Sequence, residues 1–286
     1  KPKNISSFQA VNKIKKKFNF KKIGHAGTLD PSAEGILPIA IGKATKLIPF
    51  LNSDTKTYLF TISWGTQTST DDKEGHILHQ SSHIPHINDL KKKMKNYIGF
   101  FLQEPPKVSA VKIDGQRAYK LFRQKKNFKI FPKTVYVKNL EILKHENSET
   151  IFKIECGSGF YVRSLARDLA LDLNTFGHIQ TLERTKVGKF NKESSILLDD
   201  LLKIGQRQLE INCIYPTISM LDDILAYEIV DENDFKDLSF GRSIKIGGKI
   251  LGNPKSISSD KKIIFLSYKG DIISFGKLNG NLFEPN

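Results

Sequence analysis

Three glycines and a proline fall within twelve residues near the N-terminus, in the segment GHAGTLDPSAEG of residues 24–35. Neither a regular helix nor a regular strand accommodates that density of turn-forming residues. The segment therefore predicts a structured loop, with Asp30 near its middle. Both flanks are regular. Apolar residues recur at helical spacing over residues 6–18, behind a serine N-cap, and a strand-like run covers residues 36–41.

The rest of the chain mixes strand and helix patterns with turn signals. From residue 235 onwards, seven glycines separate short β-prone pieces, which indicates a small β-rich second domain. We expect a first domain over residues 1–216, an acidic connector over residues 217–234 and the β-rich domain over residues 235–286. Within the first domain, strands are expected at residues 57–64, 135–143 and 151–156, and helices at residues 117–126, 161–173 and 196–204.

Basic residues outnumber acidic ones by 45 to 30, and the excess is unevenly distributed. Residues 1–60 carry a net charge of +8 and residues 91–138 carry +12, whereas residues 199–235 carry −7. Such concentrations predict a polyanionic partner, either nucleic acid or membrane phosphates. No window approaches the roughly 18 apolar residues of a membrane span. The two cysteines, Cys156 and Cys213, form neither a disulfide framework nor a four-ligand zinc site, which favours a reducing cytoplasm.

Familiar cofactor motifs are missing. The pair Gly157-x-Gly159 lacks the third glycine of a dinucleotide fingerprint, and no Gly-Lys-Ser/Thr phosphate loop occurs. Four histidines between residues 76 and 86 lie around a proline in a polar stretch, so we expect a solvated loop there rather than a metal site. The sequence therefore predicts neither a metal nor a cofactor.

Two interpretations of Asp30 are open on the residues alone. Its carboxylate either caps its own Leu-Asp-Pro turn or serves beside a nucleic acid, where a cation must offset its charge. Arginine is scarce, with seven against 38 lysines. An arginine in this chain therefore indicates a position that needs the forked guanidinium rather than a positive charge alone. Arg163 begins the helix expected after the Gly-Ser-Gly turn, and Arg167 follows one turn later on the same face. An Asp30–Arg163 pair is chemically sensible.

Several segments, in order along the chain, carry a family resemblance. They cover residues 1–7, 24–46, 56–58, 103–119, 159–165 and 182–185. These segments resemble the ordered motifs of the TruB family of tRNA pseudouridine synthases, and the Asp30 segment resembles the catalytic motif. The likeness covers nearly the whole chain. Val108 stands where an aromatic residue is usual, Ser69 replaces an acidic residue and Glu183 replaces a basic one, but no residue that the chemistry needs is missing.

The resemblance implies an α+β pseudouridine-synthase fold, in which helices flank a mixed, mainly antiparallel sheet. It also implies a basic RNA-binding insertion at about residues 105–133 and a PUA-like C-terminal domain. The implied reaction converts the uridine at position 55 in the T loop of tRNA to pseudouridine, on a base flipped out of the RNA. Asp30 is the implied nucleophilic or charge-stabilising carboxylate, and attack on the sugar and attack on the base both stay open.

Further roles follow from the resemblance. Arg163 keeps Asp30 ionised and oriented, while Tyr58 stacks on the uracil and helps proton removal at C5. His25 occupies the space that the flipped base leaves, and Leu182 closes the pocket. The other substrate-binding residues expected are Gly27, Thr28, Lys112, Arg117, Tyr119 and Arg184.

The expected partner is the T arm of tRNA, bound by a cytoplasmic monomer with no membrane association and no obligatory protein partner. Two alternatives stay open. The first is an RNA-guided relative that modifies ribosomal RNA, which normally carries basic extensions and needs protein partners. The second is a non-catalytic RNA-binding or tRNA-folding protein on the same scaffold. Intact Asp30, Tyr58 and Arg163 argue against a loss of catalysis.

Overall fold

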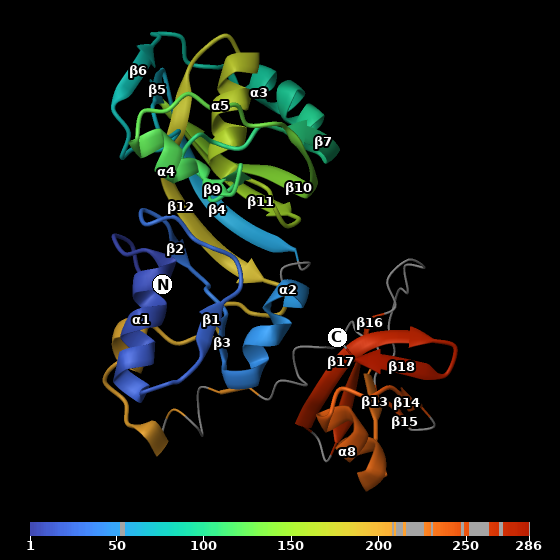
Figure 1. The fold of residues 1–286 in the computed structure, drawn as a ribbon. Coiled ribbons are helices and arrows are strands. Elements are labelled where there is room, and N and C mark those ends of the chain that lie inside the picture. The colour runs from blue at the N-terminus through green and yellow to red at the C-terminus, as the bar shows by residue number, and fades with distance from the viewer. Residues whose placement is uncertain are drawn as a thin grey trace. The chain divides into compact units, whose positions relative to one another are not determined.

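The computed structural model describes residues 1–51, 55–207, 209, 214–215, 226–229, 231–246, 249–251, 263–268 and 271–285. The chain divides into two compact units, Lys1–Gln206 and Arg207–Asn286 (Figure 1). The first unit thus ends ten residues before the boundary expected at residue 216. No helix among the described residues is long and apolar enough to cross a membrane.

A six-stranded sheet organises the first unit. Its strand order is β2-β12-β4-β11-β10-β7, and only the β2–β12 pairing is parallel. This arrangement confirms the expected α+β fold with a mixed, mainly antiparallel sheet. The strands are β2 (Glu34–Gly35), β12 (Gly177–Val187), β4 (Lys56–Trp64), β11 (Glu149–Cys156), β10 (Lys133–Glu146) and β7 (Gly99–Gln103).

The core of this unit lies between the sheet and two helices, α3 (Ile87–Met94) and α5 (Val162–Asp172). Alternate residues of β4 point into it, because successive side chains of a strand face opposite sides. Phe60 of β4 stacks on Phe152 of β11, with ring centroids 5.1 Å apart. Helix α5 adds a continuous apolar side, so its first turn is fixed against the sheet. The expected helix over residues 161–173 is confirmed.

The N-terminal helix α1 (Ser7–Phe18) begins with a capping box, in which Ser6 and Gln9 satisfy each other's backbone N–H groups. It confirms the helix expected over residues 6–18. Strands β1 (Ile23–His25) and β3 (Ile39–Ile41) pair and bring the two ends of the glycine-rich loop together. The strand expected over residues 36–41 is thus shorter. A 3-10 turn, η1 (Gly42–Leu47), and a short helix, α2 (Ile48–Leu51), follow.

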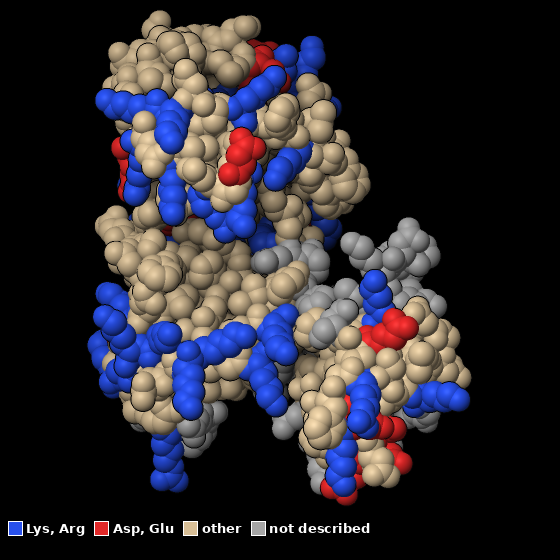
Figure 2. Space-filling model, in the orientation of Figure 1, with Lys and Arg blue, Asp and Glu red and all other residues tan. Residues whose placement is uncertain are grey.

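The basic insertion carries a small hairpin, β8 (Lys112–Ile113) with β9 (Gln116–Arg117), and then helix α4 (Ala118–Arg123). The helix expected over residues 117–126 ends early, because Lys125 adopts a left-handed conformation with φ of 52°. Lys and Arg gather over α4 and β9, and again over α1, β1 and α2 (Figure 2). The charge concentrations expected from the sequence are therefore surface features.

The histidine run forms more than a loop. A hairpin pairs β5 (Thr66–Thr68) with β6 (Ile77–Gln80), and a 3-10 turn, η2 (Lys95–Tyr97), follows α3. His79 stacks on Phe176 with ring centroids 5.1 Å apart, and the Nδ1 atom of His86 accepts the Asn88 N–H at the start of α3. The expectation of a solvated loop is therefore wrong in part. No group of His, Cys, Asp or Glu within the described residues has a metal-site arrangement.

The second unit is β-rich, as expected. One sheet has the strand order β14-β18-β17-β16-β13-β15, and helix α8 (Glu232–Ser239) adds Leu238 to its core. The strands are β13 (Ala226–Glu228), β14 (Ile244–Lys245), β15 (Lys249–Leu251), β16 (Ile263–Tyr268), β17 (Asp271–Asn279) and β18 (Leu282–Pro285).

The connector expected over residues 217–234 is corrected in its second half. Strand β13 pairs with both β15 and β16, and α8 begins at Glu232, so these residues belong to the folded second unit. Acidic side chains in the first turn of a helix stabilise it by interacting with the positive end of its dipole, and Glu232 and Asp234 of α8 contribute part of the local negative charge in this way. The helix expected over residues 196–204 is reduced to α6 (Leu198–Leu201). Residues 216–225 and Cys213 lie outside the described residues.

Candidate active site

Asp30 lies in the glycine-rich loop, next to a buried anchor. Leu29 is packed in the core, and its backbone N–H and C=O both bond to the Ser7 hydroxyl at the start of α1, at 2.8 and 2.9 Å. The Asp30 carbonyl accepts the Ala33 N–H at 3.1 Å, which closes the turn. The loop is therefore held by its own backbone and by α1, and the Asp30 carboxylate is directed elsewhere.

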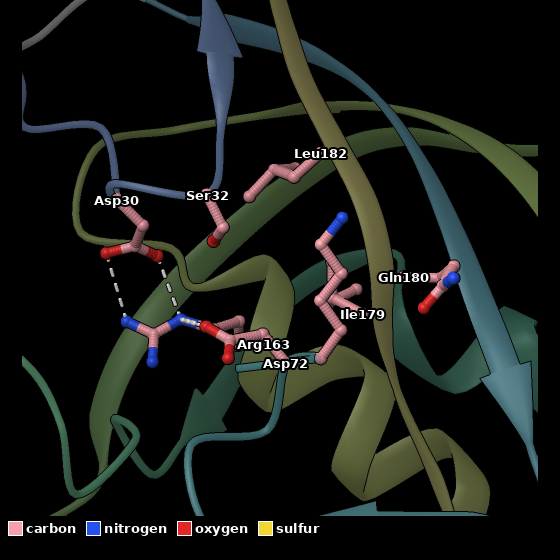
Figure 3. A pocket seen from close by; sticks show the side chains of 8 residues that line it. Asp30, Ser32, Asp72, Arg163, Ile179, Gln180 and Leu182 are labelled. Atoms are coloured by element: carbon pink, nitrogen blue, oxygen red, sulfur yellow. Dashed lines mark hydrogen bonds and ion pairs between the residues drawn. The ribbon is translucent and has the colours of Figure 1, made fainter. Parts of the chain in front are cut away.

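That carboxylate forms a two-pronged ion pair with Arg163, as expected from the sequence. Arg163 Nε lies 2.8 Å from Asp30 Oδ2, and Nη2 lies 3.1 Å from Oδ1 (Figure 3). The two side chains differ in exposure, at 34% for Asp30 and 6% for Arg163. Arg163 is fixed further by the carbonyls of Thr70 and Val108, each 2.9 Å away. A rigid donor thus orients a carboxylate that solvent and substrate can reach.

A second carboxylate shares the same guanidinium. Asp72 Oδ2 lies 3.9 Å from Arg163 Nε, and Asp72 Oδ1 accepts hydrogen bonds from the Thr70 hydroxyl and the Glu74 N–H. Sequence reasoning missed Asp72 as a site residue. The only signal in the sequence is a pair of adjacent aspartates in a turn-rich segment, and the fold alone brings that segment to Asp30.

Arg167 extends the charged cluster along α5. Its Nη1 lies 3.3 Å from Asp71 Oδ2, its Nε 2.8 Å from Asp168 Oδ1, and its Nη2 donates to the Glu104 carbonyl. Burial raises the pKa of Asp71, and the charges of Arg167 and Arg163 oppose that rise. The two arginines lie one helical turn apart on the same face, as their spacing predicted. Together they tie the 70–72 turn to the first turns of the helix.

Tyr58 lies on β4, opposite Arg184 of β12, with its side chain buried. Burial raises the pKa of Tyr58 to about 12, although the charge of Arg184 and a hydrogen bond from it oppose the rise. The phenol therefore stays protonated at neutral pH. The hydroxyl in this state is a poor acceptor for a proton, and the buried ring is not among the residues that line the pocket beside Asp30.

A small pocket, partly open to solvent, lies beside the ion pair. Asp30, Asp72 and Arg163 form its charged side, and Leu182 of β12 supplies an apolar wall (Figure 3). Leu182 thus lines this pocket, and its role in closing the pocket stays a prediction. The remaining lining residues are Ser32, Lys73, Ile179 and Gln180.

His25, Gly27 and Thr28 lie at the entrance of the Asp30 loop. His25 ends β1, and its Nδ1 atom is buried without a hydrogen-bond partner among the described residues. Burial lowers the pKa of His25, and the charge of Arg184 lowers it further, so the imidazole is neutral at pH 7. Gly27 has a φ of +80°, which favours glycine, and Thr28 is exposed.

The expected RNA contacts of the insertion lie on its surface. Lys112 and Arg117 are register partners in the β8–β9 hairpin, and both are exposed. Tyr119 follows at the start of α4, where the Arg123 guanidinium lies 5.9 Å from its ring centroid. The insertion reaches the site itself through the Val108 carbonyl, which accepts a hydrogen bond from Arg163. The hairpin is therefore connected to the Asp30 ion pair by one short segment of chain.

Arg184 differs from the other expected substrate-binding residues. Its exposure is only 1%, and its Nε and Nη2 donate to the carbonyls of Ile36 and Gly27 at 2.8 and 2.9 Å. In this structure the side chain points into the interior and has no surface to offer an RNA. The assignment of Arg184 to substrate binding from the sequence is corrected on this ground.

Comparisons with known sequences give a consistent result. Residues 15–162 match the TruB family pseudouridylate synthase N-terminal domain, and residues 163–226 match the tRNA pseudouridylate synthase B C-terminal domain. The tRNA pseudouridine synthase B of Bartonella bacilliformis is 38% identical, over all of this chain and 92% of that protein. The Ehrlichia chaffeensis protein of the same name is 41% identical, over 86% of this chain and 84% of its own length. The Wolbachia pipientis protein is 48% identical over 75% of this chain, a match that spans 61% of its length.

Solved structures share the fold at lower identity. A chain of a Cbf5–Nop10–Gar1 complex superposes with a TM-score of 0.72 and 24% identity, over 97% of this chain and 76% of that one. A chain of an H/ACA ribonucleoprotein bound to a substrate RNA containing 2′-deoxyuridine gives 0.71 and 20%, over 100% of this chain and 82% of that one. Both likenesses extend over nearly the entire chain.

Proposed function

The chain belongs to the TruB family of pseudouridylate synthases, and from that premise we propose that it isomerises uridine 55 in the T loop of tRNA, with Asp30 as the reacting carboxylate. The observation that carries the proposal is the two-pronged Asp30–Arg163 ion pair at the edge of a pocket. It supplies an oriented carboxylate beside a pocket that is partly open to solvent.

The reaction itself explains what the site must provide. The N1 glycosidic bond of uridine breaks, the uracil turns, and C5 bonds to C1′ of the ribose. C5 then loses its proton and N1 gains one, so substrate and product are isomers. A carboxylate serves this sequence by attacking the sugar or the base, or by stabilising positive charge on the sugar. Asp30 lies at the pocket for any of these roles.

Arg163 has the role of orienting Asp30. A guanidinium that holds both carboxylate oxygens limits rotation of the carboxylate, and near-attack geometry is worth orders of magnitude in rate. Asp72 lies near Arg163 Nε, the same nitrogen that contacts Asp30 Oδ2, and offsets part of the Arg163 charge, so Asp30 shares this cation with a second carboxylate. We infer that this sharing leaves Asp30 reactive while fixing its direction.

The uracil would lie between the Asp30 carboxylate and the apolar wall. Tyr58 offers a neutral ring for stacking, and Leu182 covers the pocket. His25 is neutral and lies at the end of β1, which suits it to fill the space of a base that has left its stack. Because the Tyr58 phenol is protonated, we assign it stacking ahead of proton removal at C5.

The basic insertion suits the T arm as the bound part of tRNA. Exposed cations on β8, β9 and α4 can contact phosphates, and folded RNA is recognised mainly through its shape and backbone. Lys112 and Arg117 are the hairpin contacts, with Tyr119, Gly27 and Thr28 nearer the base. We further propose a monomer that works in the cytoplasm without an obligatory protein partner, because one chain supplies Asp30, Arg163, Tyr58 and the insertion.

The proposal is tested by incubating the purified protein with an unmodified tRNA transcript and mapping pseudouridine along the whole RNA. We expect modification at position 55 alone. A transcript with cytidine at position 55 is the matched substrate control and should remain unmodified. Modification elsewhere in the tRNA, or none with a protein that binds it, contradicts the proposed function.

A further inference from the structure

Arg184 is buried next to the Asp30 loop, where an unpaired positive charge is costly. Arginine side chains are rarely buried without a carboxylate partner. Its exposed fraction is 1%, and its Nε and Nη2 atoms donate to main-chain carbonyls rather than to carboxylates. The role of Arg184 must therefore be sought in the groups that its guanidinium binds.

One planar group connects the two ends of the Asp30 loop. Arg184 Nε donates to the Ile36 carbonyl and Nη2 to the Gly27 carbonyl, and Arg184 of β12 is the register partner of Tyr58 on β4. Gly27 precedes Asp30 by three positions and Ile36 follows it by six. The guanidinium therefore holds both ends of the loop that carries the carboxylate, and the pairing of β12 with β4 sets that loop beside Tyr58.

The loop is shaped around this side chain. A Cβ atom at Gly27 would lie 3.2 Å from Arg184 Nη1, and Gly27 has a φ of +80°. Backbone bonds add to the connection, because the Ile36 N–H donates to the Arg184 carbonyl at 2.8 Å and β2 pairs with β12 at this point. Movement of Arg184 must consequently shift the Asp30 loop.

We propose that Arg184 is a positioning residue, which sets the placement of the Asp30 loop relative to Tyr58 and never touches the RNA. This inference rests on the proposed function. The long arginine side chain is suited to the task, because its fork fixes two carbonyls in one plane, whereas a lysine ammonium has no such geometry.

The test compares Arg184→Met and Arg184→Lys with the unchanged protein in single-turnover assays on tRNA. We expect Arg184→Met to lower the rate constant about 10- to 100-fold, the scale of an ångström misplacement, with the tRNA Kd within about threefold. Arg184→Lys should also be slow, since one ammonium cannot replace the fork. Weaker binding with an unchanged rate constant would instead identify a direct RNA contact and overturn the proposal.

Hydrogen exchange separates positioning from a general loss of stability. Leu90 of α3 is fully buried, so Leu90→Ala serves as a control that lowers stability without changing the loop contacts. Well below the unfolding temperature, Arg184→Met should lose amide protection in residues 26–36 selectively, and Leu90→Ala should not. Equal, uniform losses in both variants overturn the positioning role. This readout needs no turnover, so it remains informative if the protein fails to modify tRNA.

Discussion

A single guanidinium shared between two carboxylates dominates the chemistry at the residue scale. Arg163 contacts both oxygens of Asp30, and Asp72 lies 3.9 Å from its Nε. The residues alone made an Asp30–Arg163 pair chemically sensible, and the family resemblance assigned Arg163 to orient Asp30, so the pair was expected from the sequence. Asp72 and the buried position of Arg184 could not, because their partners are set by packing between distant segments.

Arg163→Lys tests the value of the fork. Lysine keeps the charge but offers no planar pair of donors to the two oxygens of Asp30, so the carboxylate is poorly aimed. We expect the single-turnover rate to fall by about 100-fold, with tRNA affinity almost unchanged. Single-turnover assays and a binding titration measure the two quantities. A rate near that of the unchanged protein would show that charge alone suffices.

His25 predicts a pH effect on stability. Its pKa is lowered in the folded protein below the ordinary 6.5, mainly by burial, so the unfolded chain binds the proton more readily. The contribution of His25 to the free energy of unfolding is therefore fully present above pH 6.5 and is lost as the pH falls below it. His25→Gln should lose less stability between about pH 7 and about pH 5, as measured by denaturant unfolding. Parallel pH profiles for the two proteins would exclude this contribution.

At the scale of elements, the sheet was predictable where its strands alternate regularly and not where they are interrupted. Strands β4 and β11 follow the expected pattern of alternate buried residues. Strand β12, at the centre of the site, was missed because two register shifts, near Gln180 and Thr185, break its two-residue period. Hairpin β5–β6 was missed in a polar stretch, and helix α3 was missed although Ile87, Leu90 and Met94 recur at helical spacing.

Gly35→Ala tests the short parallel pairing of β2 with β12. Gly35 has a φ of +113°, and an added Cβ would lie 2.2 Å from the Arg184 carbonyl oxygen, so the backbone must move. We expect a lower Tm and slower turnover. Gly42→Ala is the matched control, because Gly42 has a φ of +60° and nothing within 4 Å of an added Cβ. Equal effects of the two substitutions would contradict the importance of the β2–β12 pairing.

The basic insertion gives a second element-scale prediction. Changing the exposed Lys125, Lys126 and Lys129 to Gln should weaken the salt dependence of tRNA affinity. The slope of log affinity against log salt concentration should fall by about 0.7 for each phosphate that the protein no longer neutralises. The control changes the exposed Lys144, Lys153 and Lys203, which lie outside both basic concentrations, to Gln, with the same change of net charge. Binding titrations over a salt series decide the matter. Identical slopes for both triple variants would show that the insertion makes no special contact with the RNA.

At the scale of the whole molecule, two compact units with separate cores divide the chain. The second unit's β-rich character was evident from its glycine spacing, while its start was misplaced because β13 lies in an acidic stretch without a strong strand pattern. The net charge of +15 fits a polyanionic substrate. Charge alone left membranes and nucleic acids open, and the ordered motifs pointed to RNA.

Release of the C5 proton from uracil measures the central claim most directly, because the proposed reaction must break that bond. A tRNA carrying tritium at C5 of its uridines should release one equivalent of tritium with the unchanged protein. Asp30→Asn keeps the shape of the side chain and removes its charge, so we predict no release above background and a tRNA Kd within a few fold. Appreciable release by Asp30→Asn at undiminished affinity would contradict the role of Asp30.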